Sequence, residues 1–564
     1  MFKPQLINSL KSYSLKKFFS DLTAGIIVGL VALPMAIAFA IASGVSPEAG
    51  LFTAIVAGFL ISALGGSTVQ IGGPTGAFAV IVYGIVSPYG LSGLATATIM
   101  AGVILILLGV FKMGGLVKFI PYTIITGFTA GIALTIFAGQ ISDFLGLSIT
   151  HFPEGFTKMP GDFLGKIKTY ALNITSVNWY SFGLAAVSLV FLFVWPKINK
   201  KIPASLIVII VATVASTLIE KYSGLKTDTI GTRYGSIPSS LPLPKLPDFR
   251  LSTIKTLFPT SISIAVLAAV ESLLSAVVAD SMTGEKHDSN TELIAQGIAN
   301  IAAPLFGGIP ATGAIARTAT NIKNGGKTPV AGIIHALTLL LVLLFLGKFA
   351  LYIPMAVLAA ILINISWNMA GFGAIKALCK GQKSDICVLA VTFIITVFVD
   401  LTVAICVGLG LSAFFFIKKM IDLSEVQSKR ETLTGGISNT KNTLDFPEEK
   451  IELPEGVVVY EIDGPLFFGT VRKFEVAIEK ANVNYKVLIL RMRNTIYLDA
   501  GGLRALEQAK NACDRKGIQI VISGIHTQPY MLLEKSGLAD KLLRENICEN
   551  IDKALERSRE ILSK

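Results

Sequence analysis

The sequence predicts a polytopic α-helical membrane domain followed by a small soluble α/β domain. Of the 564 residues, 52% are hydrophobic and 15% are charged, whereas about a quarter of the residues in a soluble protein are charged. The apolar residues are concentrated between positions 22 and 420, while residues 421–564 have an ordinary soluble composition. A short Gly/Pro motif interrupts the apolar sequence twice, once in each half of the predicted membrane domain.

The interrupting motif reads Gly-Gly, then Pro, then Thr-Gly-Ala. The first copy covers residues 72–79 and the second covers residues 307–316, with Arg317 directly after it. Paired Gly/Pro-broken segments in two halves of a membrane protein indicate a binding site. We expect each copy to be an extended segment leading into a half-helix, with the two helix starts facing each other. Free N–H groups and the positive dipole end of a helix favour an anion. Alternatively, Gly and Pro only allow close helix packing.

The first half occupies about residues 21–220, after a Lys-containing lead-in at 1–20 that lacks the cleavage site of a signal peptide. Its apolar runs approach the ~20 residues that cross a bilayer. They lie at about 22–43, 48–64, 91–111, 121–143, 178–195 and 204–220, with the broken segment at 68–87 and a polar stretch at 145–177. Pro34 in the first run permits a kink.

The second half occupies about residues 256–420, after a Pro-rich loop at 221–255. Its apolar runs lie at about 257–279, 291–305, 329–350, 352–369 and 384–420, with the second broken segment at 307–323. The run at 384–420 is too long for one crossing and has Asp400 in its middle, so we divide it into two spans. The total is about 14 segments with the short broken helices counted.

The basic residues predict the orientation of the chain. Many of them lie in short loops beside the spans: Lys16, Lys17, Lys112, Lys118, Lys197, Lys200, Lys201, Lys376, Lys380, Lys383, Lys418 and Lys419. An even number of spans places both termini on one side, and the positive-inside rule makes that side cytoplasmic. The net charge of +12 is therefore no sign of nucleic-acid binding.

The C-terminal region predicts a linker at 421–455 and an α/β domain at 456–564. Strand patterns at 456–462, 486–492 and 518–523 alternate with helical patterns at about 470–482 and 500–516. The five cysteines and four histidines have no metal-ligand or disulfide spacing. No nucleophile–base constellation stands out either, so the sequence favours neither an enzyme nor a bound cofactor.

Residues 20–420 resemble the SulP sulfate-permease family, also called solute carrier family 26, and residues 455–560 resemble the STAS domain. The motifs that carry the membrane-domain resemblance lie at 29–40, 44–47, 50–51, 72–74, 280, 283–284, 290, 292–293, 295–300 and 325–328. The resemblance implies a seven-plus-seven inverted repeat like that of uracil permease, in which a core domain slides against a gate domain. It also implies homodimers.

The resemblance places an anion pocket at the starts of the third and tenth helices. The corresponding residues are Phe39, Gly76, Ala77, Phe78, Gly313, Ala314, Ile315 and Arg317. Backbone N–H groups would bind the anion, Phe78 would supply an apolar wall and Phe39 matches a pocket aromatic. Met35 departs from the family, which often has Gln after the proline.

Two buried charges have competing interpretations. Charged residues at membrane depth are usually paired or functional. Arg317 would act on the anion, or it would be a structural partner of a buried acid. Glu271 would take up a proton, or it would hold Na⁺ with Ser272 and Ser275 as oxygen neighbours. The structural alternative for both is an ion pair between Glu271 and Arg317.

Taken with the resemblance, the sequence predicts secondary active transport of small inorganic anions across a bacterial inner membrane, with sulfate as the family default and H⁺ or Na⁺ coupling. The alternatives are a bicarbonate or dicarboxylate symporter or exchanger, and an uncoupled anion channel. A signalling role for the STAS domain is weakened because Ala500 and Gly501 stand where antagonists of this type carry a phosphorylated Ser. Asp499 before them is then expected to cap a helix.

Overall fold

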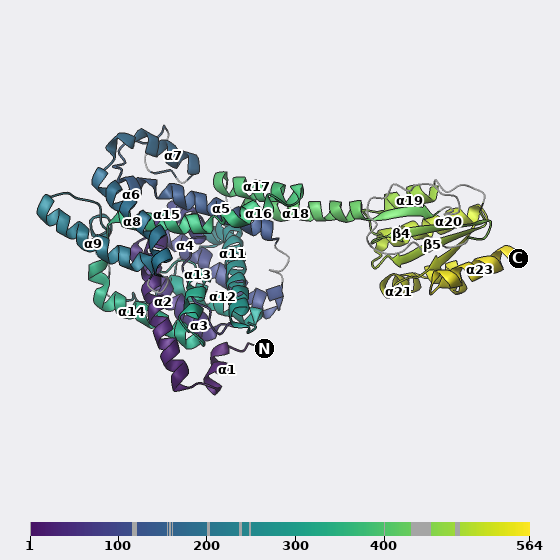
Figure 1. Cartoon of the computed structure of the whole chain (residues 1–564), viewed down its shortest axis with the longest axis horizontal. Helices are drawn as coiled ribbons and strands as arrows, with labels where there is room; N and C mark the ends of the chain where they lie inside the picture. The colour runs from purple at the N-terminus through teal and green to yellow at the C-terminus, as the bar shows by residue number, and fades with distance from the viewer. Residues whose placement is uncertain are drawn as a thin grey trace. The chain divides into compact units, whose positions relative to one another are not determined.

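The computed structural model describes residues 2–115, 121–154, 156, 159–160, 162–199, 203–235, 238, 240–247, 250–399, 401–429, 453–479 and 485–564. The chain forms two compact units, Met1–Leu411 and Ser412–Lys564 (Figure 1). The first unit is helical apart from one two-stranded pairing, and the second contains a five-stranded sheet. The predicted combination of a helical membrane domain and an α/β domain is therefore confirmed.

The helices of the first unit follow the apolar runs of the sequence. Those of the first half are α1 (Gln5–Lys11), α2 (Leu15–Ala42), α3 (Pro47–Leu64), α4 (Phe78–Val110), α5 (Tyr122–Gly139), α6 (Ile141–Leu145), α7 (Phe163–Leu172), α8 (Trp179–Ile198) and α9 (Ala204–Ser223), with a 3₁₀ turn at Ile174–Ser176. The loop between the two halves contains α10 (Ile230–Tyr234). The helices of the second half are α11 (Leu251–Thr283), α12 (Ser289–Leu305), α13 (Ile315–Lys323), α14 (Pro329–Ala350), α15 (Met355–Met369), α16 (Phe372–Leu378) and α17 (Lys383–Phe398). Helix α18 (Leu401–Leu423) crosses the boundary between the two units.

Ten helices in the described part of the chain are long and apolar enough to cross a membrane. Residues 384–420 do divide into two helices, because α17 ends at Phe398 and α18 begins at Leu401; Asp400 itself lies outside the described residues. Helix α17 is not among the ten, so a second crossing in this stretch stays a prediction. Helix α4 contains Gly90 with φ of 65°, two residues after Pro88, which divides it into two helical segments. The total of 14 crossings, which counts the short broken helices, stays a prediction.

The helices of the first unit pack in two groups. The core bundle consists of α2, α3, α4, α11, α12, α13 and α14, and the gate bundle consists of α5, α6, α8, α9, α15 and α17. We name them after the two domains that the family resemblance implies. In the core bundle, a Cβ on Gly102 of α4 would overlap the carbonyl of Gly297 on α12, and the reverse is also true. Small residues at this crossing let the two backbones approach closely.

The start of α2 is tied to the turn before α14. Asp21 is fully buried, and its carboxylate accepts hydrogen bonds from the backbone N–H of Lys327 (2.7 Å) and from the N–H and hydroxyl of Thr328 (3.2 and 2.6 Å). The Tyr13 hydroxyl donates to the same carboxylate at 3.2 Å. Burial and the adjacent carboxylate raise the pKa of Tyr13 to about 12, so the phenol stays protonated near neutral pH. The turn at 325–328 is therefore held by an acidic side chain of α2.

The second unit is built on a sheet with the strand order β3-β4-β5-β6-β7. Its strands are β3 (Glu425–Lys429), β4 (Val457–Asp463), β5 (Val487–Asn494), β6 (Gln519–Ser523) and β7 (Ile547–Cys548). Its helices are α19 (Val471–Glu479), α20 (Ala500–Arg515), α21 (Thr527–Lys535), α22 (Leu538–Leu542) and α23 (Ile551–Ser563), with a 3₁₀ turn at Arg544–Asn546. Strands β4 to β7 are parallel, and α23 packs on one face of the sheet while α19 to α22 cover the other.

The three predicted strands and two predicted helices of this unit are confirmed. Asp499 caps α20 as expected, since its carboxylate accepts from the N–H of Gly502 at 2.7 Å. Two elements fall inside the predicted linker at 421–455: α18 continues to Leu423, and β3 pairs antiparallel with β4. The rest of that linker, 430–452, lies outside the described residues.

Candidate functional site

The two copies of the Gly/Pro motif lie side by side in the core bundle. Strand β1 (Gly72–Gly73) pairs antiparallel with β2 (Thr312–Gly313), with Gly72 opposite Gly313 and Gly73 opposite Thr312. Helix α4 begins at Phe78 after the first copy, and α13 begins at Ile315 at the end of the second. The expectation that each copy is an extended segment leading into a helix is therefore confirmed, and the pairing brings both helix starts to one place.

A cavity of about 740 Å³ lies between these helix starts and the gate bundle. The core bundle contributes Phe39 and Met35 from α2, Gly76 and Ala77 before α4, Glu271 from α11, and Gly313, Ala314, Ile315 and Arg317 around the start of α13. The gate bundle contributes mainly apolar side chains, among them Phe128, Leu192, Ile361 and Met369. Eight of the eleven site residues expected from the sequence, and Met35, thus line one cavity. The other three, Phe78, Ser272 and Ser275, do not.

Backbone donors at both helix starts lack acceptors in the described structure. Neither Gly76 nor Ala77 has a hydrogen-bonded N–H, and the same holds for the first three residues of α13, Ile315, Ala316 and Arg317. The first turn of a helix leaves such groups unsatisfied, and the aligned peptide dipoles add positive potential there. Both features favour an anion in the cavity.

Three backbone N–H groups that were expected to bind the anion donate instead to acceptors within the protein. The N–H of Gly313 donates to the Ser272 hydroxyl at 2.9 Å, and that of Ala314 donates to the carbonyl of Ile71 at 2.8 Å. The N–H of Phe78 donates to the carbonyl of Thr75 at 3.3 Å. The free donors of the second copy therefore begin two residues later than expected, at Ile315 instead of Gly313.

Phe78 does not form the expected apolar wall. Its side chain is fully buried inside the core bundle, because the first turn of α4 directs it away from the cavity. Phe39 and Phe128 supply aromatic surface instead, from the core bundle and the gate bundle respectively.

Arg317 links the two copies of the motif. The side chain is 2% exposed, and its Nη2 donates to the carbonyl of Pro74 at 2.9 Å. Its Nη1 is buried without a hydrogen-bond partner. A Cβ at Gly73, where φ is 151°, would overlap Nη1, so only glycine leaves room for the guanidinium. An unpaired guanidinium N–H in a buried position is costly unless a ligand satisfies it.

Glu271 binds the first copy and does not bind Arg317. Its Oε2 accepts a hydrogen bond from the Thr75 hydroxyl at 2.9 Å. No ion pair joins Glu271 to Arg317, and both residues lie within the described part of the chain. The structure therefore does not contain the ion pair between Glu271 and Arg317 that was the structural alternative.

Ser272 and Ser275 hold the second copy on α11 and do not face the cavity. The Ser272 hydroxyl lies 2.8 Å from Thr312 Oγ1, and Ser275 donates to Thr318 Oγ1 at 3.2 Å. Both side chains are fully buried. Because their oxygens are engaged with β2 and α13, the expectation that they accompany Glu271 as cation ligands has no support in this geometry.

Some cavity residues were not singled out from the sequence. Thr75, the partner of Glu271, lies inside the first copy, and Asn364 and Asn368 come from α15 in the gate bundle. The two amides are four residues apart and hydrogen-bond each other at 3.3 Å. The sequence already contained this signal, because the two amides lie one helical turn apart in a mainly apolar span. Polar groups at membrane depth cost free energy, so they often mark a functional site.

Polar side chains on α12 support the site from behind. The Asn300 amide donates to the carbonyl of Ala311 and accepts from its N–H, at 2.8 and 2.9 Å. The Glu292 carboxylate accepts from the N–H groups of Gly66 and Ser67 and from the Gln296 amide. These bonds fix the segments that lead into both copies.

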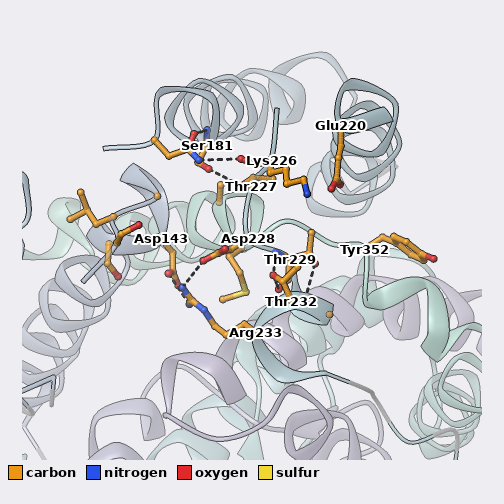
Figure 2. Close-up of a pocket in the computed structure, with 18 of the residues that line it drawn as sticks. Asp143, Ser181, Glu220, Lys226, Thr227, Asp228, Thr229, Thr232, Arg233 and Tyr352 are labelled. Carbon is orange, nitrogen blue, oxygen red and sulfur yellow. Dashed lines mark hydrogen bonds and ion pairs between the residues drawn. The ribbon is translucent and has the colours of Figure 1, made fainter. Parts of the chain in front are cut away.

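A second cavity, of about 890 Å³, lies among α6, α8, α9, α10 and α15 and contains none of the expected site residues. Figure 2 shows Arg233 reaching towards Asp143 and Asp228, and the Nη1–Oδ1 distance to Asp143 is 2.8 Å. Ser181 and Thr227 pair across it at 2.7 Å. The Arg233 guanidinium is therefore neutralised by carboxylates. The starts of α8 and α10 line this cavity too, but the side chains of Asn178 and Thr229 already cap them, so their first-turn N–H groups are engaged within the protein.

Comparison with known proteins gives the same assignment for both units. Residues 18–392 match the family described as the sulfate permease family, and residues 450–554 match the STAS domain. YvdB of Bacillus subtilis (strain 168), described as a candidate sulfate transporter, is 42% identical over 543 residues, covering 96% of this chain and 98% of YvdB. The bicarbonate transporter BicA of Picosynechococcus is 29% identical over 553 residues, covering 95% of this chain and 94% of BicA.

Two solved structures have similar folds. The murine anion transporter Slc26a9 in its inward-facing state superposes with a TM-score of 0.86 at 22% identity, covering 99% of this chain and 94% of that one. The transmembrane domain of a cyanobacterial BicA superposes with a TM-score of 0.63 at 32% identity, covering 70% of this chain and 98% of that one. The first likeness, at such low identity, concerns the fold alone.

Proposed function

Because the chain belongs to the sulfate permease family and carries a C-terminal STAS domain, we propose that it is a secondary transporter of small inorganic anions. The observation that carries the proposal is the convergence of two helix starts with free N–H groups and one incompletely bonded arginine in a single cavity. Such donors replace the hydration shell of an anion without needing a cation of equal charge nearby.

Sulfate is the first candidate substrate, and bicarbonate is the second. YvdB supports sulfate through its description, while BicA, which matches almost the whole chain, supports bicarbonate. Dicarboxylates are a third option. The cavity walls next to the free donors are mostly apolar, and Met35 offers no hydrogen bond. Recognition that depends on backbone N–H groups and Arg317 suits a compact anion whose charge is spread over several oxygens.

Glu271 is the proposed coupling residue. Its carboxylate lines the cavity and has the Thr75 hydroxyl as its hydrogen-bond partner, with no cation paired to it. Entry of an anion into a cell with a negative interior costs ~2.3 kcal/mol per charge per 100 mV. Uptake of H⁺ or Na⁺ at Glu271 would offset that cost. An uncoupled channel would have no use for this carboxylate.

The proposed transport movement is a sliding of the core bundle against the gate bundle. It is supported by the position of the cavity, which has both helix starts on one side and mainly apolar gate residues on the other. We further propose a homodimer in the inner membrane of a bacterium with both termini in the cytoplasm, and we keep the predicted division of the chain at about residues 20, 420 and 455.

Uptake into proteoliposomes tests the function. Labelled sulfate, bicarbonate and a dicarboxylate would each be offered to the purified full-length protein, with no gradient, with an inward Na⁺ gradient and with an inward H⁺ gradient. We expect one anion to accumulate above its external concentration under one of the two gradients. Protein-free liposomes and a Lys323→Met variant, altered at an exposed residue outside the cavity, serve as controls.

The outcomes separate the alternatives. Saturable uptake that ignores both gradients but is accelerated by anion inside the liposomes would indicate an exchanger. Uptake that follows the membrane potential without saturation would indicate a channel. If the wild-type protein moves none of the three anions in any condition, the proposal of anion transport is wrong.

A further inference from the structure

A third cavity, of about 350 Å³, lies beyond the helix start of the first copy. It is lined by Ala79, Tyr83 and neighbouring residues of α4, by Thr135 to Gln140 of α5, and by Asp162 and Lys166 at the start of α7. Helix α7 lies at the end of the first unit opposite α1 (Figure 1). With a cytoplasmic N-terminus, this cavity is on the outer side of the membrane.

One apolar layer separates this outer cavity from the site at the helix starts. A Cβ on Gly76 would meet Cε1 of Phe39 at 3.0 Å, Cδ1 of Ile136 at 3.2 Å and Sδ of Met369 at 3.2 Å. Phe39 and Met369 line the site cavity, whereas Ile136 lines the outer cavity. Helix α4 runs from one to the other, since Ala77 lines the first and Ala79 the second. The outer cavity therefore lies on the path between the site and the outside.

Lys166 is the one cation among the described residues that line the outer cavity. Its Nζ lies 4.4 Å from the centroid of the Tyr83 ring. A cation over an aromatic face is held by ~0.5–2 kcal/mol, less than a desolvated ion pair. Burial lowers the pKa of Lys166, and Asp162 opposes that shift. The Asp162 carboxylate itself is used as a helix cap, accepting from the N–H of Gly165 at 2.7 Å.

Helix α7 holds Lys166 on the gate side of the path. It packs on α5 and α17, and the ring of Phe163 contacts that of Phe398 at a centroid distance of 5.8 Å. Lys166, on a helix that packs against the gate bundle, thus reaches Tyr83 of the core bundle across the outer entrance. A charge in a narrow, poorly hydrated entrance raises the local concentration of the oppositely charged solute.

We propose that Lys166 forms an outer subsite for the transported anion, which binds there before it reaches the two helix starts. Without an anion, the Tyr83 ring holds the ammonium group; an arriving anion replaces the ring as its partner. The proposal rests on the function proposed above and adds a specificity-determining residue to it. A purely structural role for Lys166, as a contact that supports α7, makes a different prediction about the two faces of the membrane.

The test compares transport from the two sides of the membrane. Initial rates would be measured against anion concentration for influx into right-side-out vesicles and for efflux from them, using the anion that the wild-type protein transports. For Lys166→Met we expect the influx KM to rise about 10-fold with little change in kcat. The efflux KM should stay at the wild-type value, because that anion enters from the other side.

Two further variants complete the design. Lys166→Arg keeps the charge and should restore an influx KM within about twofold of wild type. Lys168→Met removes an exposed lysine of the same helix that does not line the cavity, and it should change neither KM. Increasing salt should raise the wild-type influx KM more steeply than that of Lys166→Met, because salt screens the charge.

Other results would overturn the inference. A wild-type influx KM in Lys166→Met, or equal changes of KM in both directions, would assign the lysine a structural role only. A fall in kcat that Lys166→Arg does not restore would do the same. Failure of the wild-type protein to move any anion would instead count against the proposed function, so the two failures can be told apart.

Discussion

In the first copy of the motif no residue from Gly72 to Ala79 is charged, whereas the second copy is followed by Arg317 on the first turn of α13. The two copies pair through β1 and β2 and both present free N–H groups to the cavity. Yet both charged side chains at the site, Arg317 and Glu271, come from the second half and bind the first copy. Arg317 donates to Pro74 and Glu271 accepts from Thr75.

This difference shows how a duplicated backbone can acquire unequal chemistry. The shared part, a strand pair and two helix starts, is made from glycine, proline and main-chain groups. The unequal part needs only two charged side chains and the glycine that leaves space for one of them. We infer that the second half supplies the charge and the first half positions it. Four substitutions test this division of roles.

The largest loss is expected for Arg317→Met, which removes the positive charge but keeps most of the side-chain volume. Anion uptake should fall about 100-fold, because removing one partner of a buried charged pair costs ~2–5 kcal/mol. Uptake in proteoliposomes measures the loss, and size-exclusion chromatography checks the fold. Lys323→Met, at the exposed end of the same helix, should transport normally. Near-normal uptake by Arg317→Met would mean that the backbone donors of both copies suffice.

Glu271→Gln should abolish coupling while leaving passive transport. The amide oxygen can still accept from Thr75, so the geometry is kept and only the charge is lost. At a potential of 100 mV, accumulation driven by the cation gradient should fall ~50-fold, the equivalent of one uncompensated charge. Steady-state accumulation is the measurement, and Glu220→Gln on the exposed part of α9 is the matched control. Unchanged accumulation would mean that Glu271 has a structural role only and does not bind the coupling cation.

Gly73→Ala tests whether the first copy really positions Arg317. A Cβ there would overlap Nη1 in a backbone conformation that disfavours side chains, at a cost of ~1–3 kcal/mol or about a tenfold loss of uptake. Because the effect acts through Arg317, Gly73→Ala should add little in an Arg317→Met background. Gly183→Ala, where an added Cβ meets nothing within 4 Å, is the control. Additive losses in the double variant would contradict this coupling.

The smallest effect is expected for Thr75→Val, which removes the hydroxyl that binds Glu271. One hydrogen bond contributes ~1 kcal/mol, so uptake should fall a few-fold with coupling retained. Thr217→Val, at an exposed threonine of α9, controls for the loss of a hydroxyl alone. A loss as large as that of Glu271→Gln would mean that Thr75 sets the state of the carboxylate and does more than orient it.

Much of the architecture could be predicted because it depends on local patterns. The paired broken segments, the division of residues 384–420 and the three strands of the α/β unit follow from hydropathy, Gly/Pro positions and alternation. The family resemblance supplied the residues around the helix starts. The cavity contains most of them, including Arg317, Glu271 and Phe39.

The remaining features depend on register and rotation, which sequence patterns do not encode. The N–H of Ala314 is occupied because the pairing of β1 with β2 places it opposite the carbonyl of Ile71. Ser272 and Ser275 face the second copy because of the way α11 is rotated, although they lie one and four residues from Glu271. Strand β3 pairs with residues of β4 that lie 30 to 38 positions later in the sequence, and strand formation depends more on such pairing than on local preference.

The hydrogen bonds of the Asp21 carboxylate have a practical consequence for measurements of the transport movement. The carboxylate joins α2 to the turn before α14, while the N–H of Gln5 donates to the carbonyl of Gly65 at the end of α3. The N-terminal segment is thereby fastened to three helices of the core bundle at once. A spectroscopic probe attached near Lys3 would travel with that bundle, and a second probe on α7 would stay with the other. The distance between the two labels would then report the length of each transport stroke directly.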